Sequence, residues 1–318
     1  MKKLTSKIQI GAYLFNGVTE VTTESSWEQM TDTATITIPK RIEWQGKPLV
    51  FSDNPILKKG NAVKIELGYD DVNEAVFEGY LTNIHVMRPV KLDCQDTMWQ
   101  LKKGEFTKAY RQCTLSQLLK DMNMGVPYEV VANHDLGSYR TPKSKMTPAQ
   151  VLEDLRQNYF VKFFFRGGKL YAGLAYVAKL QTVHKLKFDV HVVENNLEFV
   201  KKEDVKIKIR CVIMKPDNKK EEFEVGDTEG EVRTLHKYNI SKEAMKILAS
   251  QEIERLKYDG FRGTLTIFGQ PFIQHGDVVD INDPETPEAK GQYLVKKVSR
   301  SFSQSGYRQT IELEGKVT

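Results

Sequence analysis

The stretch Lys59-Gly60-Asn61-Ala62-Val63-Lys64-Ile65 opens the pattern that decides the fold, and a similar stretch returns near the other end of the chain as His275-Gly276-Asp277-Val278-Val279-Asp280-Ile281. Each contains a Gly-Asn or Gly-Asp turn followed by a strand with apolar residues at every second position. In both copies a second strand then contains Tyr-Leu, at Tyr80-Leu81 and at Tyr293-Leu294. A third alternating strand closes each copy, at 90–94 and at 309–313. The chain therefore contains two candidate antiparallel meanders.

These two meanders, 59–94 and 275–313, support two interpretations. Any two antiparallel meanders share an alternating pattern, so the likeness could be a coincidence. The spacing between the strands also differs by several residues from one copy to the other. The pattern thus predicts at most a duplicated architecture, without a closely duplicated sequence.

Composition restricts the classes of protein to consider. The 318 residues are 40% hydrophobic and 28% charged, which is typical of a globular protein with room for two or more domains. The first residues, Met1 to Lys7, carry charge without an apolar run behind them, and no stretch approaches the length of a membrane span. We therefore expect a protein made in the cytoplasm, without membrane insertion.

Cysteine content and charge pattern are equally ordinary. Cys94, Cys113 and Cys211 are odd in number and form no CxxC pair, which favours reduced, structural thiols. The net charge is +5, but basic and acidic residues alternate along most of the chain. Because a nucleic-acid groove requires clustered cations, we expect no specific nucleic-acid binding.

The pattern of the first hundred residues predicts a half-buried antiparallel sheet. Asn16-Gly17 suits a type I′ turn and predicts a hairpin between Ile8–Ile10 and Val18–Val21. The run 33–39 alternates cleanly and predicts a further strand. The segment 40–58 breaks the pattern and predicts a long loop with large apolar residues. Such a loop could contact another subunit or fold back on its own sheet, and the residues concerned are Trp44, Leu49, Val50 and Phe51.

From Thr97 the spacing of the apolar residues changes from that of a strand to that of a helix. Thr114 and Thr147 each begin a capping box, with glutamine three residues later, so both predict helix starts. A hairpin that turns at 166–169 follows the second helix. Two helices and a hairpin together predict a small α+β insert at 104–180.

Strands resume after this insert, at 188–192 and 205–212, and a charged hairpin then leads to a helix. Ser241 caps this helix, and its predicted buried stripe consists of Ala244, Ile247, Leu248, Ile253 and Leu256. The predicted fold class is mainly β with α+β inserts. The predicted domains are a first β-barrel (1–103), the α+β insert (104–180), a second β-barrel (181–215 and 261–318) and a small strand-helix insert (216–260).

The chain carries none of the sequence motifs that mark common catalytic sites. It has no GxSxG, HExxH or Walker A motif, and its six histidines are not spaced as metal ligands. We expect no catalytic residue, no metal and no cofactor. A pair of carboxylates from distant segments, as in a glycan hydrolase, would leave no such trace.

A resemblance to a known family rests on short motifs in order. The motifs are Trp27 to Pro39, Gly60 to Asp70, Phe77 to Leu81, Cys94 to Lys102, Phe268 to Pro271, Gly276 to Val279, Tyr293 to Val295 and Phe302 to Leu313. In this order they resemble the baseplate hub proteins of contractile phage tails, also called late control D proteins. They cover roughly half of the chain, while the two inserts match only in position and type. The positions that carry the resemblance are Trp27, Pro39, Gly60, Gly68, Tyr69, Gly79, Tyr80, Asp96, Trp99, Pro271, Gly276, Asp277, Tyr293, Gly306 and Tyr307.

The resemblance implies two tail-tube-like barrels in one chain and a homotrimeric ring. Three chains with two barrels each would present a near-sixfold face to a hexameric tail tube and a threefold face to a spike. The implied partners are the tail tube protein, a separate spike protein and other baseplate proteins. The implied location is the baseplate of a virion tail, assembled in the bacterial cytoplasm. Some relatives carry a fused spike or lysozyme region, whereas this sequence ends at Thr318, just beyond its last strand.

Two alternatives stay open from the sequence. The first is the hub part of a type VI-like secretion spike or another phage-derived injection system. The second, with less support, is a cell-wall glycan hydrolase.

Overall fold

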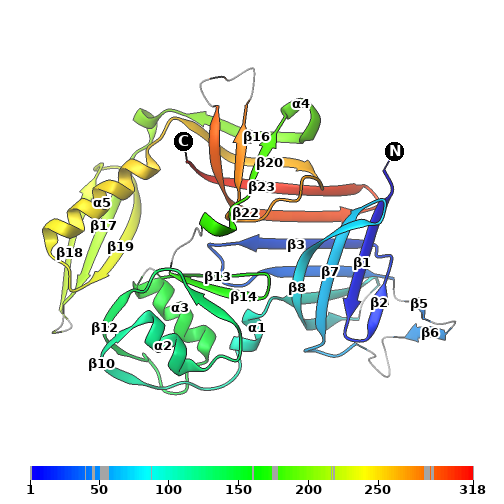
Figure 1. Ribbon diagram of the computed structural model, residues 1–318, viewed down its shortest axis with the longest axis horizontal. Coiled ribbons are helices and arrows are strands. Elements are labelled where there is room, and N and C mark those ends of the chain that lie inside the picture. Colours follow the sequence, from blue (N-terminus) through cyan, green and yellow to red (C-terminus); the bar gives the residue numbers. More distant parts are fainter. Residues whose placement is uncertain are drawn as a thin grey trace.

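The computed structural model describes the backbone of most of the chain. The described residues are 2–39, 41–44, 47–50, 57–86, 88–159, 161–173, 178–215, 217, 219–282, 287 and 290–317. The molecule is mainly β, with several antiparallel sheets and a few helices (Figure 1). This confirms the predicted fold class.

A single extended sheet runs through the molecule and contains both meanders. Its first part consists of β1 (Leu4–Ile10), β2 (Tyr13–Phe15), β3 (Glu20–Ser26), β4 (Thr33–Ile38), β7 (Ala62–Tyr69), β8 (Val72–His85) and β9 (Val90–Gln95). Its second part consists of β15 (Val183–Leu186), β16 (Val192–Val200), β20 (Gly260–Phe268), β21 (Val278–Ile281), β22 (Gly291–Ser303) and β23 (Gly306–Lys316). We call these parts the first and second β unit.

The two β units have the same strand order. The first unit runs β3-β4-β9-β8-β7-β1, and the second runs β16-β20-β23-β22-β21-β15. Only β2, at the outer edge of β1, has no counterpart among the described strands of the second unit. One difference is that β1 lies antiparallel to β7, whereas β15 lies parallel to β21. The duplication therefore extends from three strands to six.

The turns that open the two meanders are built alike. Gly60 donates its N–H to the carbonyl of Leu81 at 2.7 Å, and Gly276 donates to that of Val295 at the same distance. Both glycines have a positive φ, +91° and +83°, which residues with a side chain rarely adopt. These bonds make Leu81 and Val295 equivalent positions in the two meanders. Alignment of the two Tyr-Leu pairs in the sequence equates Leu81 with Leu294, so that alignment is wrong by one residue.

Each β unit buries its own apolar core, because alternate strand residues point to one side. In β23 every second residue from Tyr307 to Gly315 is buried. The first core includes Ile8, Ile36 and Ile65, and the second includes Leu265 and Tyr293. Phe302 and Tyr307 of the second unit are buried in the first core, so the two units are packed together.

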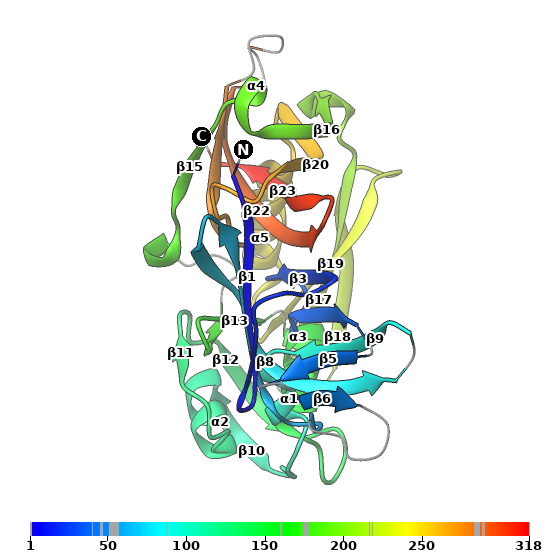
Figure 2. The ribbon, with the colours of Figure 1, turned by 90° about the vertical axis from the view of Figure 1, so that its right-hand side faces the viewer.

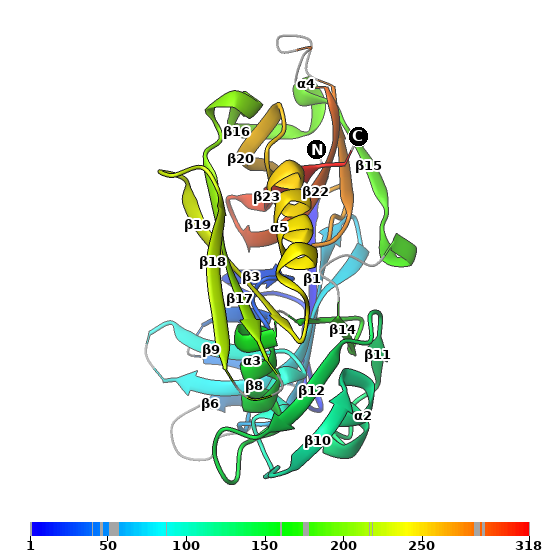
Figure 3. The ribbon, with the colours of Figure 1, turned by 90° about the vertical axis from the view of Figure 1, so that its left-hand side faces the viewer.

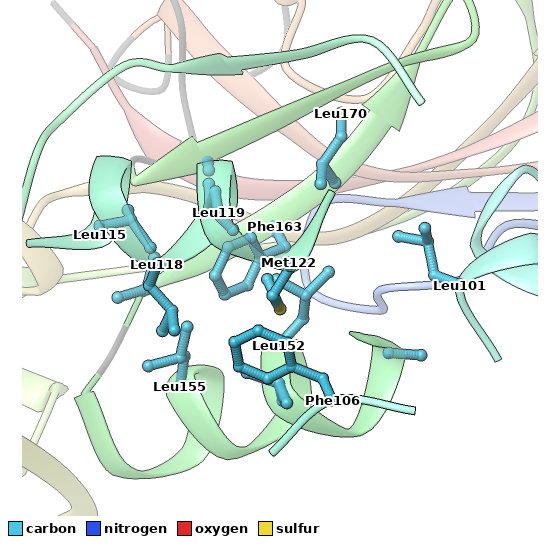
Figure 4. Close-up of a cluster of buried hydrophobic side chains, with 14 of the residues drawn as sticks. Leu101, Phe106, Leu115, Leu118, Leu119, Met122, Leu152, Leu155, Phe163 and Leu170 are labelled. Carbon is cyan, nitrogen blue, oxygen red and sulfur yellow. The ribbon is translucent and has the colours of Figure 1, made fainter. Parts of the chain in front are cut away.

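The α+β insert folds as the capping boxes predict. Its elements are β10 (Ala109–Thr114), α2 (Leu115–Met122), β11 (Tyr128–Val130), β12 (Asp135–Arg140), α3 (Pro148–Tyr159), β13 (Lys162–Arg166) and β14 (Lys169–Gly173). The short helix α1 (Met98–Leu101) precedes the insert and adds Met98 and Leu101 to the same core. At the start of α3, Thr147 and Gln150 exchange the two hydrogen bonds of a capping box, at 2.9 and 3.3 Å. The helices and the β13–β14 hairpin enclose the core drawn in Figure 4, where α2 and α3 contribute Leu118 and Leu152.

The second insert is larger than predicted. Its sheet contains β17 (Ile207–Met214), β18 (Lys220–Gly226) and β19 (Glu231–Tyr238), and α5 (Lys242–Leu256) packs on it (Figure 3). The sequence placed all of β17 in the second barrel (181–215), but β17 pairs with β18 and β19 instead. A strand's own pattern shows that it is a strand, but it does not show which strands it joins.

The helix α5 is capped by Ser241 as predicted, but its buried face differs in part. The Ser241 hydroxyl accepts a hydrogen bond from Ala244 N at 3.1 Å. Ile247 is 60% exposed, while Met245 and Ala249 are fully buried. The predicted stripe was therefore wrong at Ile247, although Leu256 is buried as predicted.

Two local predictions were wrong. The hairpin of β1 turns at Gly11, whose φ is +57°, and pairs Ile10 with Tyr13, so Asn16-Gly17 lies in the following loop. The segment Phe188–His191 forms a short helix, α4, where the sequence predicted a strand. Short 3-10 turns occur at η1 (Ala178–Leu180) and η2 (Lys202–Asp204).

The segment 40–58 contains a hairpin of β5 (Arg41–Trp44) and β6 (Lys47–Val50) rather than only a loop. Trp44, Leu49 and Val50 lie on these strands, but their side chains are outside the described part of the structure, as is Phe51. Their predicted role in subunit contact stays a prediction.

Candidate assembly interface

The two β units are joined into one sheet at a junction where β3 pairs antiparallel with the second half of β22. The register joins Ser26 to Lys297 and Glu20 to Ser303. Two salt bridges cross it: Lys297 Nζ lies 2.8 Å from Glu24, and Lys296 Nζ lies 2.9 Å from Glu28. The junction therefore combines main-chain pairing with complementary charge, and it makes the two units one continuous sheet (Figure 1).

The strand β22 can serve both units because it changes partner halfway along. Its residues 291–294 pair with β21, and its residues 297–303 pair with β3 along the same edge. Between these segments the register with β23 shifts at Val295/Lys297. The same irregularity occurs in the first unit, where β8 shifts against β9 at Leu81/Asn83. The segment of β8 that begins at Asn83 is thus the counterpart of the junction segment of β22.

The other half of the junction also has a counterpart. In the first unit, Thr23 of β3 pairs with Ala34 of β4, which pairs with Cys94 of β9. In the second unit, Leu197 of β16 pairs with Gly263 of β20, which pairs with Leu313 of β23. Because Cys94 and Leu313 are equivalent in the two meanders, this equates β3 with β16.

These two counterparts are open edges. Among the described strands β16 pairs only with β20, along all of Val192–Val200. The end of β8, from Asn83 to His85, has β9 on one side, and its pairing with β7 stops at Tyr80. Val86 and Val193 beside these edges are exposed by 45% and 46%. Long open edges offer unpaired N–H and C=O groups, so they favour pairing with another strand.

A buried carboxylate connects the α+β insert to the second β unit. Asp277 is 2% exposed, and its Oδ1 accepts a hydrogen bond from Arg166 Nη2 at 2.9 Å. Its Oδ2 lies 3.1 Å from His184 Nε2 and accepts a bond from Gln274 N at 2.9 Å. Burial alone would raise the pKa of Asp277, but these hydrogen bonds and the charge of Arg166 outweigh burial and lower it. The carboxylate is therefore held ionised, and it fixes the hairpin of the insert to the turn of the second meander.

A second polar cluster lies at the junction itself. The Ser25 hydroxyl is 2.6 Å from Asp32 Oδ2 and 2.7 Å from His275 Nδ1. Burial raises the pKa of Asp32, against hydrogen bonds from Ser25 and Ser26, and burial lowers the pKa of His275. Serine lies between the acid and the histidine, whereas a nucleophilic triad needs the histidine in the middle. The cluster therefore joins segments from both units without the order of groups that such catalysis requires.

The positions that carry the family resemblance fall mostly at turns and at the seam between the units. Tyr69 and Tyr307 have ring centroids 5.9 Å apart, and Tyr69 Oη donates to Tyr307 O at 3.2 Å. Tyr80 stacks on Trp99 at 5.4 Å between centroids. Asp96 accepts hydrogen bonds from Met98 N and Asp32 N, at 2.9 and 3.1 Å.

The other predicted positions have structural surroundings as well. Trp27 packs with Phe164 and Tyr171, and the Tyr293 hydroxyl accepts from Phe261 N at 3.2 Å. Gly60 and Gly276 lie in the turns before β7 and β21, and Asp277 is the buried carboxylate described above. Gly68 lies within β7 and Gly79 within β8. The remaining positions are Pro39 after β4, Pro271 after β20 and Gly306 at the start of β23.

The described residues contain no group of three or more His, Cys, Asp or Glu side chains that could hold a metal ion. In the same part of the chain, no helix is both long and apolar enough to cross a membrane. Cys94, Cys113 and Cys211 are free and buried.

No protein-family model matches the sequence, and no curated protein matches it either. Solved structures do match. A 43 kDa tail protein of prophage MuSo2 from Shewanella oneidensis has a TM-score of 0.64 and 17% identity over 97% of each chain. A tail protein from Neisseria meningitidis has a TM-score of 0.69 and 14% identity, over 98% of this chain and 96% of that one.

A third match comes from a secretion system. An Escherichia coli component of the type VI secretion system, described as similar to the bacteriophage T4 tail proteins gp27 and gp5, has a TM-score of 0.63 and 8% identity. The match covers 97% of this chain and 76% of that one. At these identities the likeness concerns the fold, so the chain has the fold of phage tail proteins and of this type VI component.

Proposed function

We propose that this chain is the structural baseplate hub of a contractile phage or prophage tail. Three copies would form a ring with two β units each, and the ring would join the hexameric tail tube to the trimeric spike. The observation that carries this proposal is the repeated strand order, with one junction made within the chain and the equivalent edges, β16 and the end of β8, left open. The likeness to tail proteins supports the same role.

The internal junction specifies how neighbouring chains would pair. Ser26 opposes Lys297, so by equivalence Val200 of one copy would oppose Asn83 of the next. Likewise Glu24 opposes Ser299, so Glu198 would oppose His85. The contact joins two different edges of the same chain, which is the heterologous type that generates rings when the rotation closes.

This proposal includes the division of the chain into domains. The two β units would be the tube-like barrels, at 1–103 and within 181–318, with the α+β insert (104–180) and the strand-helix insert between their strands. Since β17 belongs to the sheet of the second insert, that insert would begin before Ile207 and not at 216. The chain would act without catalysis in the virion tail, after assembly in the bacterial cytoplasm, and would contact other baseplate proteins.

A second candidate is the hub part of a type VI-like secretion spike, which the likeness to the Escherichia coli component favours. The two candidates share the ring and differ in their genetic surroundings. Neighbouring genes for a capsid and a tape measure protein would indicate a phage, and their absence beside secretion genes would indicate the second candidate.

The ring is best tested by a disulfide placed across the proposed contact. The variant His85→Cys/Glu198→Cys puts two exposed thiols at opposing positions, where paired strands bring Cα atoms to about 4.5–5.5 Å. The native cysteines are buried, so they give little background. We expect oxidation to give a covalent species of three times 36.5 kDa on a non-reducing gel. Light scattering should give the same mass for the unmodified chain.

The matched control is His85→Cys/Glu194→Cys, because Glu194 is also exposed on β16 but lies four residues from the proposed partner. It should not cross-link between neighbours at a comparable rate. Equal cross-linking of the two variants would refute the register. A stable monomer that does not cross-link at high concentration would refute the ring.

A further inference from the structure

A groove of about 1010 Å³ lies at the seam between the two β units. Its walls come from the start of β1, the turn between β7 and β8, β15 with α4, the end of β20, and the turn between β22 and β23. Figure 2 shows β1, β15 and α4 in one view. Its volume is at the upper end of the range for ligand pockets, so it has room for a short peptide segment.

The groove is apolar where it is open to solvent. Val183, Val190 and Phe268 line it and are exposed by 50%, 60% and 41%. Nine large apolar side chains are this exposed in the described part of the chain, and three of them gather in this groove. Such a cluster marks a site that another molecule covers.

The charges around the groove have mostly one sign. Lys2, Lys185 and Arg308 line it, and Glu74 is the only described acidic residue that does. Lys2 donates to the amide of Gln270 at 3.0 Å, and the guanidinium of Arg308 lies 4.7 Å from the ring centroid of Phe268. None of the three cations has a carboxylate of the described chain within 4.0 Å of its charged nitrogens. Among the described residues, Glu74 is therefore the only carboxylate that offsets this positive charge within the groove.

We propose that this groove binds a segment of another protein in which apolar and acidic residues alternate. The apolar side chains would cover Val183, Val190 and Phe268, and the carboxylates would face Lys2, Lys185 and Arg308. The site goes beyond the hub role, since it lies within one chain and is present whether or not a ring forms. Charge complementarity selects an acidic segment over a basic one.

The test uses fluorescence anisotropy with three labelled peptides on the full chain. The probe carries alternating leucine and glutamate between Gly-Ser ends. One comparison peptide replaces each glutamate by lysine, and the other replaces each leucine by serine. We expect the probe to bind about tenfold or more tightly than either comparison peptide, and raised salt to weaken its binding.

Charge reversal locates the site. Lys2→Glu/Lys185→Glu should weaken probe binding about tenfold, because two cations of the groove become anions. The control Lys3→Glu/Lys187→Glu makes the same change in net charge at exposed lysines outside the groove, and should bind as the unmodified chain does. A Val190→Ser variant should also weaken probe binding, because it removes an apolar side chain from the wall of the groove.

Failure of the probe to bind, or equal loss in the reversed and control variants, would overturn the proposal. Equal binding of the acidic and basic peptides would overturn it too. The mass of every variant in solution is measured alongside, since failure of the ring appears there and failure of the groove appears in the anisotropy. A loss of probe binding that follows self-association would assign the groove to a second copy of this chain and would also refute the proposal.

Discussion

Asn61 and Asp277 occupy the same place in the two meanders and make the same turn. Asn61 Oδ1 accepts from Lys58 N at 2.7 Å, and Asp277 Oδ2 accepts from Gln274 N at 2.9 Å. Beyond the turn they differ, because Asp277 also accepts from Arg166 and contacts His184. A neutral amide is sufficient to shape the turn, and the charged version in addition fixes the α+β insert.

Their burial explains the difference. Asn61 is partly exposed, whereas Asp277 is 2% exposed. A carboxylate buried this deeply is tolerated only with charged and hydrogen-bonded partners, which Arg166 and His184 provide. The second copy therefore depends on a residue from another part of the chain, and the first does not.

The largest expected effect is that of Asp277→Ala. The change leaves Arg166 without its carboxylate in a largely buried site, so we expect a loss of about 3–5 kcal/mol in the free energy of unfolding. Urea denaturation measures it. A loss below that of Asn61→Ala would contradict the distinction between the two turns.

Asp277→Asn should have an intermediate effect, because it keeps the shape and removes the charge. We expect a loss of about 1.5–3 kcal/mol near neutral pH, the contribution of hydrogen bonds to a charged group. The pKa of Asp277 is below its ordinary 3.8, so its stabilisation is present above pH 3.8 and is lost as the pH falls through the folded-state pKa. The stability difference between this variant and the unmodified chain should therefore shrink below pH 3.8, and a constant difference would count against an ionised Asp277.

Asn61→Ala should cost about 0.5–1.5 kcal/mol, the usual contribution of a neutral hydrogen bond. The bond to Lys58 N lies in a partly exposed turn, so water can replace it. The same denaturation series measures the change. A cost as large as that of Asp277→Ala would show that Asn61 has a further role.

Asn61→Asp should have the smallest effect, within about 0.5 kcal/mol, because a carboxylate oxygen can accept the same bond at a partly exposed site. This variant gives the first turn the residue type of the second without the partners Arg166 and His184. A large gain or loss in the free energy of unfolding would show that the two turns differ in their side-chain surroundings although their backbones are alike.

Much of this fold could be predicted from local signals. The capping boxes at Thr114 and Thr147 and the alternating strands predicted elements that the structure contains. The duplication could have been followed further, because Ala34-Thr35-Ile36-Thr37-Ile38 and Gly263-Thr264-Leu265-Thr266-Ile267 are alike and occupy equivalent strands.

The candidate interface was harder to predict, because it depends on pairings between distant segments. The junction joins 20–26 to 297–303, and the contact of Arg166 with Asp277 spans 111 positions. A pattern within one strand indicates which face is buried but does not indicate the neighbouring strand. The open edges of β16 and β8 appear only once all the other pairings are known.

The junction between β3 and β22 also has a consequence for biosynthesis. The ribosome makes β3, at 20–26, long before its partner segment, at 297–303, emerges. Contacts between such distant segments slow folding, because a long loop must close before they form. During this interval the nascent chain carries an incomplete sheet whose β3 edge could recruit the wrong strand, so a chaperone that shields this edge would increase the yield of native protein.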